Sequence, residues 1–308
     1  MVGAHSRTGD NRPMLLPNPA VDEWGLGELV RERDGADPAG LAFAPVGGDG
    51  WHYRCPPFWV SVRRDHLGHD PRSYHAAVEL AASGLEFVLA PLPDRDGRIV
   101  HPFHPFPVVV LPLVEGDTIW GGGGVRPGDW ERIAGMVRRL HAATCPALLG
   151  REEYALPFAD ELRDGLEAAE RAGPHLGPYG GAIREVVARN RSAIQAMWSE
   201  IEQLAAICRA DTAPLVPTHG EPGTNNVLRD PNDRLYLIDW GDLKYGPPER
   251  DWTSVDEARP PLRPAFERFY RLRWDLSEIA EYVARFTAPH AGNAEDDYWW
   301  REMELYLR

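Results

Sequence analysis

The sequence predicts an α+β protein of two lobes, with an antiparallel sheet in the N-terminal lobe and mainly helices in the C-terminal lobe. Short β-rich runs alternate with glycine turns up to residue 111, whereas helical periodicity dominates from residue 117 onward. A strand-rich region joined by one crossover to a helical region is typical of a bilobal layout, with a cleft between the lobes. We therefore divide the chain into a flexible tail at 1–20, a mostly β N-lobe at 21–114 and a mostly α C-lobe at 115–308.

Local patterns predict each N-lobe element in turn. Residues 21–35 space Trp24, Leu26, Leu29 and Val30 as one helical stripe. The other expected elements are a hairpin with a glycine turn over 41–64, a helix over 71–83, short strands over 87–90 and 99–101, and a buried strand over 108–111.

The C-lobe is predicted to be helical apart from one short hairpin. Helical periodicity covers 129–143, 158–172, 181–208 and 262–286. The glycine run over 120–124 is interpreted as a linker, because no helix with a Lys and a Ser or Thr follows it, as a phosphate-binding Walker loop requires.

The composition narrows the class of partner. A net charge of −14 disfavours nucleic acid, which demands basic surfaces. The acidity favours either a cationic small substrate or simple solubility. The basic residues are almost all arginine, since Lys244 is the only lysine in the chain.

No segment predicts a membrane or secreted location. The longest apolar run, 106–114, is too short to cross a bilayer, and the first residues have no apolar signal region. The three cysteines are isolated, which fits a reducing compartment and disfavours a zinc site. We expect a cytoplasmic monomer or dimer without membrane or nucleic-acid partners.

The stretch from His219 to Asp239 has the order of a kinase-type catalytic loop followed by a metal loop. Glu221 completes a His-Gly-acid triplet, Asn226 follows five residues later, and an apolar strand ends at Asp239. One acid can orient a hydroxyl nucleophile, while amide and carboxylate oxygens can hold Mg²⁺ against phosphates. The sequence therefore predicts a site that binds a metal and a nucleotide.

Five segments together carry a family resemblance. They are FAPVGGDGWHYRC, FWVSVRR, VVVLPLVEG, HGEPGTNNVL with LIDWGD, and GPPERDW. On these segments the chain resembles the aminoglycoside phosphotransferase family, which has a protein-kinase-like fold, and within it the branch around spectinomycin phosphotransferase. The resemblance covers roughly residues 20–290. It implies ATP or GTP as phosphate donor, Mg²⁺ as cofactor and a small-molecule acceptor.

The resemblance also implies roles for residues of the catalytic loop. Glu221 would accept or orient the proton of the attacking hydroxyl. Asn226 and Asp239 would hold Mg²⁺ between the nucleotide phosphates. His219 and Asp251 would support the loop without taking part in the chemistry.

For the nucleotide, the resemblance implies contacts from the N-lobe and the hinge. Leu111 and Leu113 would offer backbone hydrogen bonds to the base. Gly47 and Gly48 would let the first hairpin approach the phosphates.

The chain departs from the family at the phosphate-gripping lysine of the N-lobe. The matching position is Ser61, and no lysine elsewhere in the N-lobe replaces it. Strand alternation places Arg63 on the same face, so Arg63 is expected to reach in instead. The helix acid that pairs with the lysine is also missing near 73–75, and Glu79 is the nearest candidate. The preference for ATP or GTP therefore stays open.

A second departure is Glu221, where the family usually has Asp. One extra methylene moves the carboxylate, and misplacement by about 1 Å can cost ~100-fold in rate. Pro222 follows directly and restricts Glu221 to extended backbone angles, so the loop is expected to be shaped for Glu.

The leading hypothesis is an antibiotic kinase that acts on an aminocyclitol, an aminoglycoside or a nucleoside and thereby confers resistance. Asp160, Trp252 and Asp256 are the candidate residues of the acceptor pocket. A metabolic kinase resembling choline or homoserine kinases is the first alternative. A non-catalytic nucleotide-binding pseudokinase, favoured by Ser61 and the missing helix acid, is the second.

Overall fold

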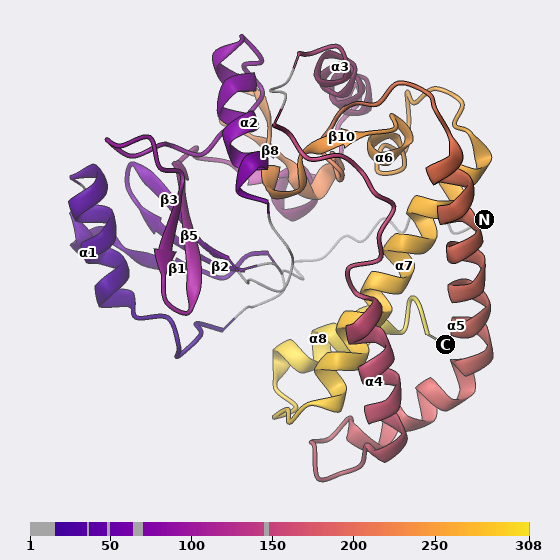
Figure 1. Cartoon of the computed structure of the whole chain (residues 1–308). Helices are drawn as coiled ribbons and strands as arrows, with labels where there is room; N and C mark the ends of the chain where they lie inside the picture. The colour runs from indigo at the N-terminus through magenta and orange to yellow at the C-terminus, as the bar shows by residue number, and fades with distance from the viewer. Residues whose placement is uncertain (1–15, 36, 48–49, 64–69, 145–147, 308) are drawn as a thin grey trace.

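The computed structural model confirms the expected α+β, bilobal fold (Figure 1). It describes residues 16–35, 37–47, 50–63, 70–144 and 148–307. Most of the expected tail and one glycine of the first hairpin, Gly48, lie outside the described residues. A sheet with helix α1 forms one lobe, and helices α4, α5, α7 and α8 dominate the other (Figure 1).

The N-lobe sheet has five antiparallel strands in the order β1-β2-β3-β5-β4. Their bounds are β1 Ala42–Ala44, β2 Gly50–Cys55, β3 Phe58–Arg63, β4 Val100–Phe103 and β5 Phe106–Pro112. Alternation along β3 places Val60 and Val62 in the core beneath α1. Ser61 and Arg63 therefore face the opposite side of the sheet, toward the C-lobe.

Helix α1, Glu23–Asp34, begins where the Asp22 carboxylate accepts a hydrogen bond from the Gly25 N–H. Leu26 and Val30 are fully buried against the sheet. The expected stripe was wrong in including Trp24, whose side chain is 77% exposed. Trp24 lies two residues before Leu26 and is therefore turned about 200° away from it around the helix.

The segment at 87–90 is not a strand of the N-lobe sheet, in contrast to the expectation. Val88 makes a single parallel bridge to Leu237, and the Phe87 carbonyl accepts a hydrogen bond from the Leu237 N–H. The segment thus joins the catalytic hairpin of the C-lobe. The sequence of these four residues alone does not determine which sheet the segment joins.

Helix α2, Pro71–Ala82, connects the two lobes. Its residues Ala76, Ala77 and Leu80 share a core with Trp240 and Leu243 of the C-lobe. This packing holds α2 against the 3-10 turn Trp240–Asp242 that follows the expected metal ligand.

The C-lobe is built around long helices, as expected. Their bounds are α3 Asp129–His141, α4 Ala159–Arg171, α5 Gly180–Ala210, α6 Glu249–Trp252, α7 Pro264–Thr287 and α8 Ala294–Met303. Helices α4 and α5 both pack against α7 in one apolar core (Figure 1). None of the helices in the described ranges has the length and apolar character needed to cross a membrane.

Two small sheets of the C-lobe carry the catalytic segment. Strands β6 Asp117–Thr118, β8 Val227–Arg229 and β9 Leu235–Leu237 form one sheet, and β7 Val216–Thr218 pairs with β10 Lys244–Gly246. The glycine run expected to be a linker belongs to a π-helical turn, Ile119–Gly123, in which Ile119 is buried. This turn packs against the 3-10 turn Thr224–Asn226 of the catalytic loop.

Candidate active site

The catalytic loop runs from the end of β7 to the start of β8 and is held by hydrogen bonds to its own backbone carbonyls. The Asn226 side-chain N–H donates to the Glu221 carbonyl at 3.0 Å. The Ile238 N–H donates to the Asn226 carbonyl at 2.9 Å, which places Asp239 next to the loop. Glu221, Asn226 and Asp239 are thus brought together as the sequence predicts.

Asp239 adopts an unusual backbone conformation, with φ 64° and ψ 66°. Left-handed angles are uncommon for residues other than glycine, and aspartate and asparagine tolerate them best. The Arg63 guanidinium, from β3 of the other lobe, lies 3.3 Å from the Asp239 carboxylate. Arg63 therefore reaches across to the expected metal site, as strand alternation predicts.

His219 is buried behind the loop and fixes it from inside. Its Nε2 donates to the Ile238 carbonyl at 2.8 Å, and its ring meets Trp240 edge-on at 4.7 Å. Burial lowers the pKa of His219, with Asp251 acting in the opposite direction. These contacts place His219 where a supporting rather than a chemical role is expected.

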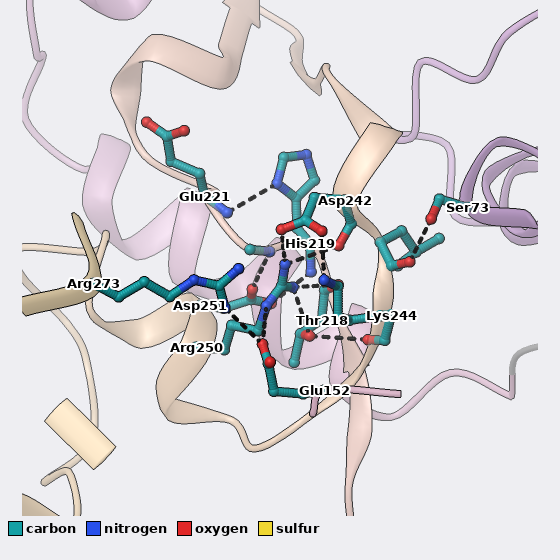
Figure 2. A network of polar contacts seen from close by, with 12 residues as sticks. Ser73, Glu152, Thr218, His219, Glu221, Asp242, Lys244, Arg250, Asp251 and Arg273 are labelled. Carbon is teal, nitrogen blue, oxygen red and sulfur yellow. Dashed lines mark hydrogen bonds and ion pairs between the residues drawn. The ribbon is translucent and has the colours of Figure 1, made fainter. Parts of the chain in front are cut away.

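Asp251 is completely buried and accepts hydrogen bonds from the start of the loop (Figure 2). Its carboxylate accepts from the Gly220 N–H at 2.7 Å, from the His219 N–H at 3.1 Å and from His141 Nε2 at 2.9 Å. Burial alone would raise the pKa of Asp251, but the hydrogen bond from His141 and the Arg250 charge lower it.

Removing the Asp251 carboxylate is expected to destabilise the fold strongly. Asp251→Ala leaves the backbone N–H groups of His219 and Gly220 and the His141 ring nitrogen without their acceptor, a loss of about 3–5 kcal/mol in the free energy of unfolding. Denaturant titration at pH 7 measures this, with the exposed Asp164→Ala on α4 as control. Because the pKa is lowered, the contribution is present at neutral pH and is lost as the pH falls through the folded-state value. A loss below 1 kcal/mol would contradict this anchoring role.

Arg250 lies next to Asp251 and ties several segments together, a role that the sequence did not reveal (Figure 2). It donates to the Thr218 carbonyl and hydroxyl at 3.1 and 2.9 Å. It also pairs with Asp242 and, at 3.3 Å, with Glu152. The motif around Asp251 contains Arg250, but it does not reveal the pair with Glu152, which lies about a hundred residues earlier in the chain.

The same guanidinium explains a glycine of the loop. Gly220 has φ 107°, and a Cβ there would lie 2.4 Å from the Arg250 guanidinium. Only glycine tolerates both the positive φ and the close approach of the guanidinium. The packing of Arg250 beneath the loop therefore requires the glycine of the His-Gly-acid triplet.

The oxygen groups of the loop suit Mg²⁺. Because the Asn226 Nδ2 is engaged by the Glu221 carbonyl, the amide oxygen is left to act as a ligand. The Asp239 carboxylate is 29% exposed and supplies a second hard oxygen. No group of three or more His, Cys, Asp or Glu side chains within the described ranges forms a metal site.

On the N-lobe side, the glycine hairpin and β3 bring a small polar cluster together. Gly47 has φ 78°, a conformation that favours glycine. The Ser61 hydroxyl hydrogen bonds with His52 Nδ1 at 2.8 Å.

Glu79, the candidate for the missing helix acid, is exposed and forms no ion pair among the described residues. Instead, the Ser73 hydroxyl of α2 donates to the Leu243 carbonyl at 2.7 Å.

The expectation that the backbone groups of Leu111 and Leu113 contact the base is corrected by a shift of one residue along the chain. The Leu113 N–H donates to the Pro57 carbonyl at 2.8 Å, so it is occupied within the N-lobe. The Val110 carbonyl accepts from the Leu92 N–H on the other side of β5. Backbone groups of a strand alternate in direction, so Leu111 also faces β3, whereas the Pro112 carbonyl and the Val114 N–H face away from it.

Among the candidate residues of the acceptor pocket, the prediction for Trp252 was wrong. It is 4% exposed and belongs to the core, so it cannot line an open pocket. Asp160 and Asp256 are exposed and remain predictions. The backbone near Asp256 approaches the loop, since a Cβ on Gly223 would lie 3.3 Å from the Ser254 carbonyl.

A model of the phosphotransferase enzyme family matches residues 61–282 of the chain. The chain belongs to this family. The match begins at Ser61 and includes the catalytic loop, both expected metal ligands and Asp251. As a member of the family, the protein is a phosphotransferase that uses an alcohol group as acceptor.

Known proteins resemble this family member over nearly its whole length. Protein StrN of Streptomyces griseus is 40% identical over 313 residues, with 96% of each chain covered. Spectinomycin phosphotransferase APH(9)-Ia, solved in complex with ADP and spectinomycin, has a TM-score of 0.71 at 16% identity, covering 90% of this chain and 93% of its own. A microcompartment-associated aminopropanol kinase has a TM-score of 0.54 at 16% identity, covering 93% and 99%.

Proposed function

We propose that the protein transfers the γ-phosphoryl group of ATP or GTP to a hydroxyl of an antibiotic and so confers resistance. The observation that carries the proposal is the convergence of Glu221, Asn226 and Asp239 on one hairpin, faced by Arg63 from the other lobe. Phosphoryl transfer needs such positioning and charge neutralisation more than a strong base.

The class of antibiotic is supported by relatives of the same fold. APH(9)-Ia binds ADP and spectinomycin, and a complex of APH(2")-IIia contains GDP and kanamycin. The net charge of −14 and the exposed Asp160 and Asp256 favour a cationic acceptor of the aminocyclitol or aminoglycoside type. A nucleoside acceptor is the remaining member of the proposed class.

In the proposed reaction each residue has a defined task. Glu221 orients the acceptor hydroxyl and takes its proton as the bond from the acceptor oxygen to the γ-phosphorus forms and the bond from that phosphorus to the β–γ bridging oxygen breaks, with ADP or GDP as the leaving group. Asn226 and Asp239 would hold Mg²⁺, which would supply positive charge against the phosphates. Arg63 contributes positive charge from the N-lobe, and the Pro112 carbonyl and Val114 N–H are the hinge groups that would contact the base.

A metabolic kinase is the second candidate. It is supported by the aminopropanol kinase, whose fold is similar at a TM-score of 0.54. Both candidates share the same catalytic groups and differ in the acceptor.

The deciding experiment is nucleotide consumption with purified protein, Mg²⁺, and ATP or GTP. The acceptor panel contains aminocyclitol, aminoglycoside and nucleoside antibiotics, with choline and homoserine. The proposal expects ADP or GDP release that depends on one antibiotic, and a mass gain of one phosphoryl group on it. Turnover only with choline or homoserine would select the metabolic kinase. A nucleotide-induced thermal shift without any turnover would favour the pseudokinase.

Arg63 gives a further prediction for nucleotide binding. Arg63→Ala removes the N-lobe cation, and charged hydrogen bonds contribute about 1.5–3 kcal/mol, so Kd for Mg-ATP should rise roughly 10- to 100-fold. Titration calorimetry measures this. Arg54→Ala, on the neighbouring strand and paired with exposed Glu115, is the control. An unchanged Kd would show that the phosphates are held by other groups.

A further inference from the structure

His52 lies opposite Ser61, the residue that replaces the family's phosphate-gripping lysine. The two are direct partners in the register of β2 and β3, so their side chains share the face that looks toward the C-lobe. The Ser61 hydroxyl and His52 Nδ1 are 2.8 Å apart. The His52 ring also stacks on Trp59, with the ring centres 5.5 Å apart and the planes at 27°. These contacts hold the imidazole in one orientation.

The other ring nitrogen of His52 lies at the glycine hairpin. A Cβ built on Gly47 would be only 3.0 Å from His52 Nε2. Gly47 belongs to the turn between β1 and β2, the turn expected to approach the nucleotide phosphates. Its lack of a side chain therefore leaves room for the imidazole beside that turn.

The environment keeps this imidazole neutral. Burial and the nearby Arg63 charge lower the pKa of His52 to about 4. A neutral imidazole has one donor and one acceptor nitrogen. If the Ser61 hydroxyl donates to Nδ1, the ring proton is on Nε2, the atom beside Gly47. Phosphate oxygens accept hydrogen bonds, so a bound phosphate favours that tautomer.

We infer that His52 is a ligand of the nucleotide phosphates, donating from Nε2, and that Ser61 positions it for this contact. The inference rests on the proposed function and extends it to a residue outside the expected site. His52 supplies a neutral donor and Arg63 supplies the charge. Together they take the place of the single lysine that the chain lacks.

The test separates contact with phosphate from a merely structural role. Kd values of the His52→Ala variant are measured by titration calorimetry for Mg-ATP, Mg-GTP and the nucleosides adenosine and guanosine. We expect the triphosphate affinities to fall roughly 10- to 100-fold, the effect of losing a hydrogen bond to a charged group, with the nucleoside affinities unchanged. His52→Gln keeps an N–H donor at the end of the side chain and should recover part of the loss. Ser61→Ala should show a smaller, equally selective loss.

His101→Ala is the matched control. His101 is a buried histidine of the same sheet, but its partner in the register, Val108, lies in the core beneath α1, on the opposite face.

An equal loss for nucleosides and triphosphates in His52→Ala, or no loss at all, would overturn the inference. If the wild type phosphorylates an acceptor and the His52 variants bind normally, only this inference fails. If the wild type binds no nucleotide, the proposed function fails with it.

Discussion

Replacing Asp239 with asparagine is expected to lower kcat at least roughly 1000-fold and to remove the Mg²⁺-dependent part of nucleotide binding. The metal contributes several kcal/mol of charge stabilisation in the transition state, and each 1.4 kcal/mol corresponds to tenfold in rate. Asparagine tolerates the left-handed backbone at this position, so the loop geometry is retained. The loss therefore reports on the missing charge and not on a distorted hairpin.

The same hairpin offers a matched control for that substitution. Asp233, in the turn between β8 and β9, has φ 63°, almost the same φ as Asp239. Its carboxylate is 56% exposed and pairs with Arg126 and Arg132 at the surface and with the buried Arg229. Asp233→Asn should leave turnover and the Mg²⁺-dependent thermal shift close to wild type. If both variants behave alike, Asp239 does not hold the metal.

Asp239→Ala adds a separate effect on stability. Alanine is strained at positive φ, and it lacks the side-chain oxygen that lies 3.3 Å from the Arg63 guanidinium and that asparagine keeps, so we expect about 1–3 kcal/mol of destabilisation beyond that of Asp239→Asn. Comparing the two variants separates the loss of a metal ligand from the loss of the contact between the lobes.

The sequence predicted those parts of the site that are local in the chain. Glu221, Asn226 and Asp239 belong to one segment of about twenty residues, and short hydrogen bonds within that segment bring them near one another. Arg63 was also predicted, because the period of two along a strand decides which residues share a face.

The errors arose where a partner far away in the chain decides the outcome. Whether Leu113 or Val114 faces the base depends on where β5 meets β3, and one residue of register reverses the direction of the backbone groups. Trp252 was misplaced because the single turn of α6 directs it into a core formed by α2 and α3. His52 was missed because only the pairing of β2 with β3 brings it to Ser61.

Replacing Glu221 with glutamine is expected to lower kcat by roughly 100- to 10,000-fold, the range that general base catalysis contributes, with the Kd for Mg-nucleotide unchanged. The backbone of Glu221 is anchored independently of its side chain, since its N–H donates to His219 Nδ1 at 3.3 Å and its carbonyl accepts from Asn226. Figure 2 shows the carboxylate pointing away from the Arg250 network. Glutamine therefore removes the base without disturbing the loop.

Two further variants make the role of Glu221 specific. Glu221→Asp keeps the charge but withdraws it by one carbon–carbon bond, and a misplacement of this size should cost about 100-fold in kcat if the loop is shaped for the longer acid. Glu257→Gln, an exposed acid of the same lobe, should turn over like the wild type. Single-turnover kinetics separate the chemical step from product release. Normal turnover of Glu221→Gln would show that the acceptor hydroxyl loses its proton without this carboxylate, and catalysis would then depend on the metal ligands and Arg63 alone.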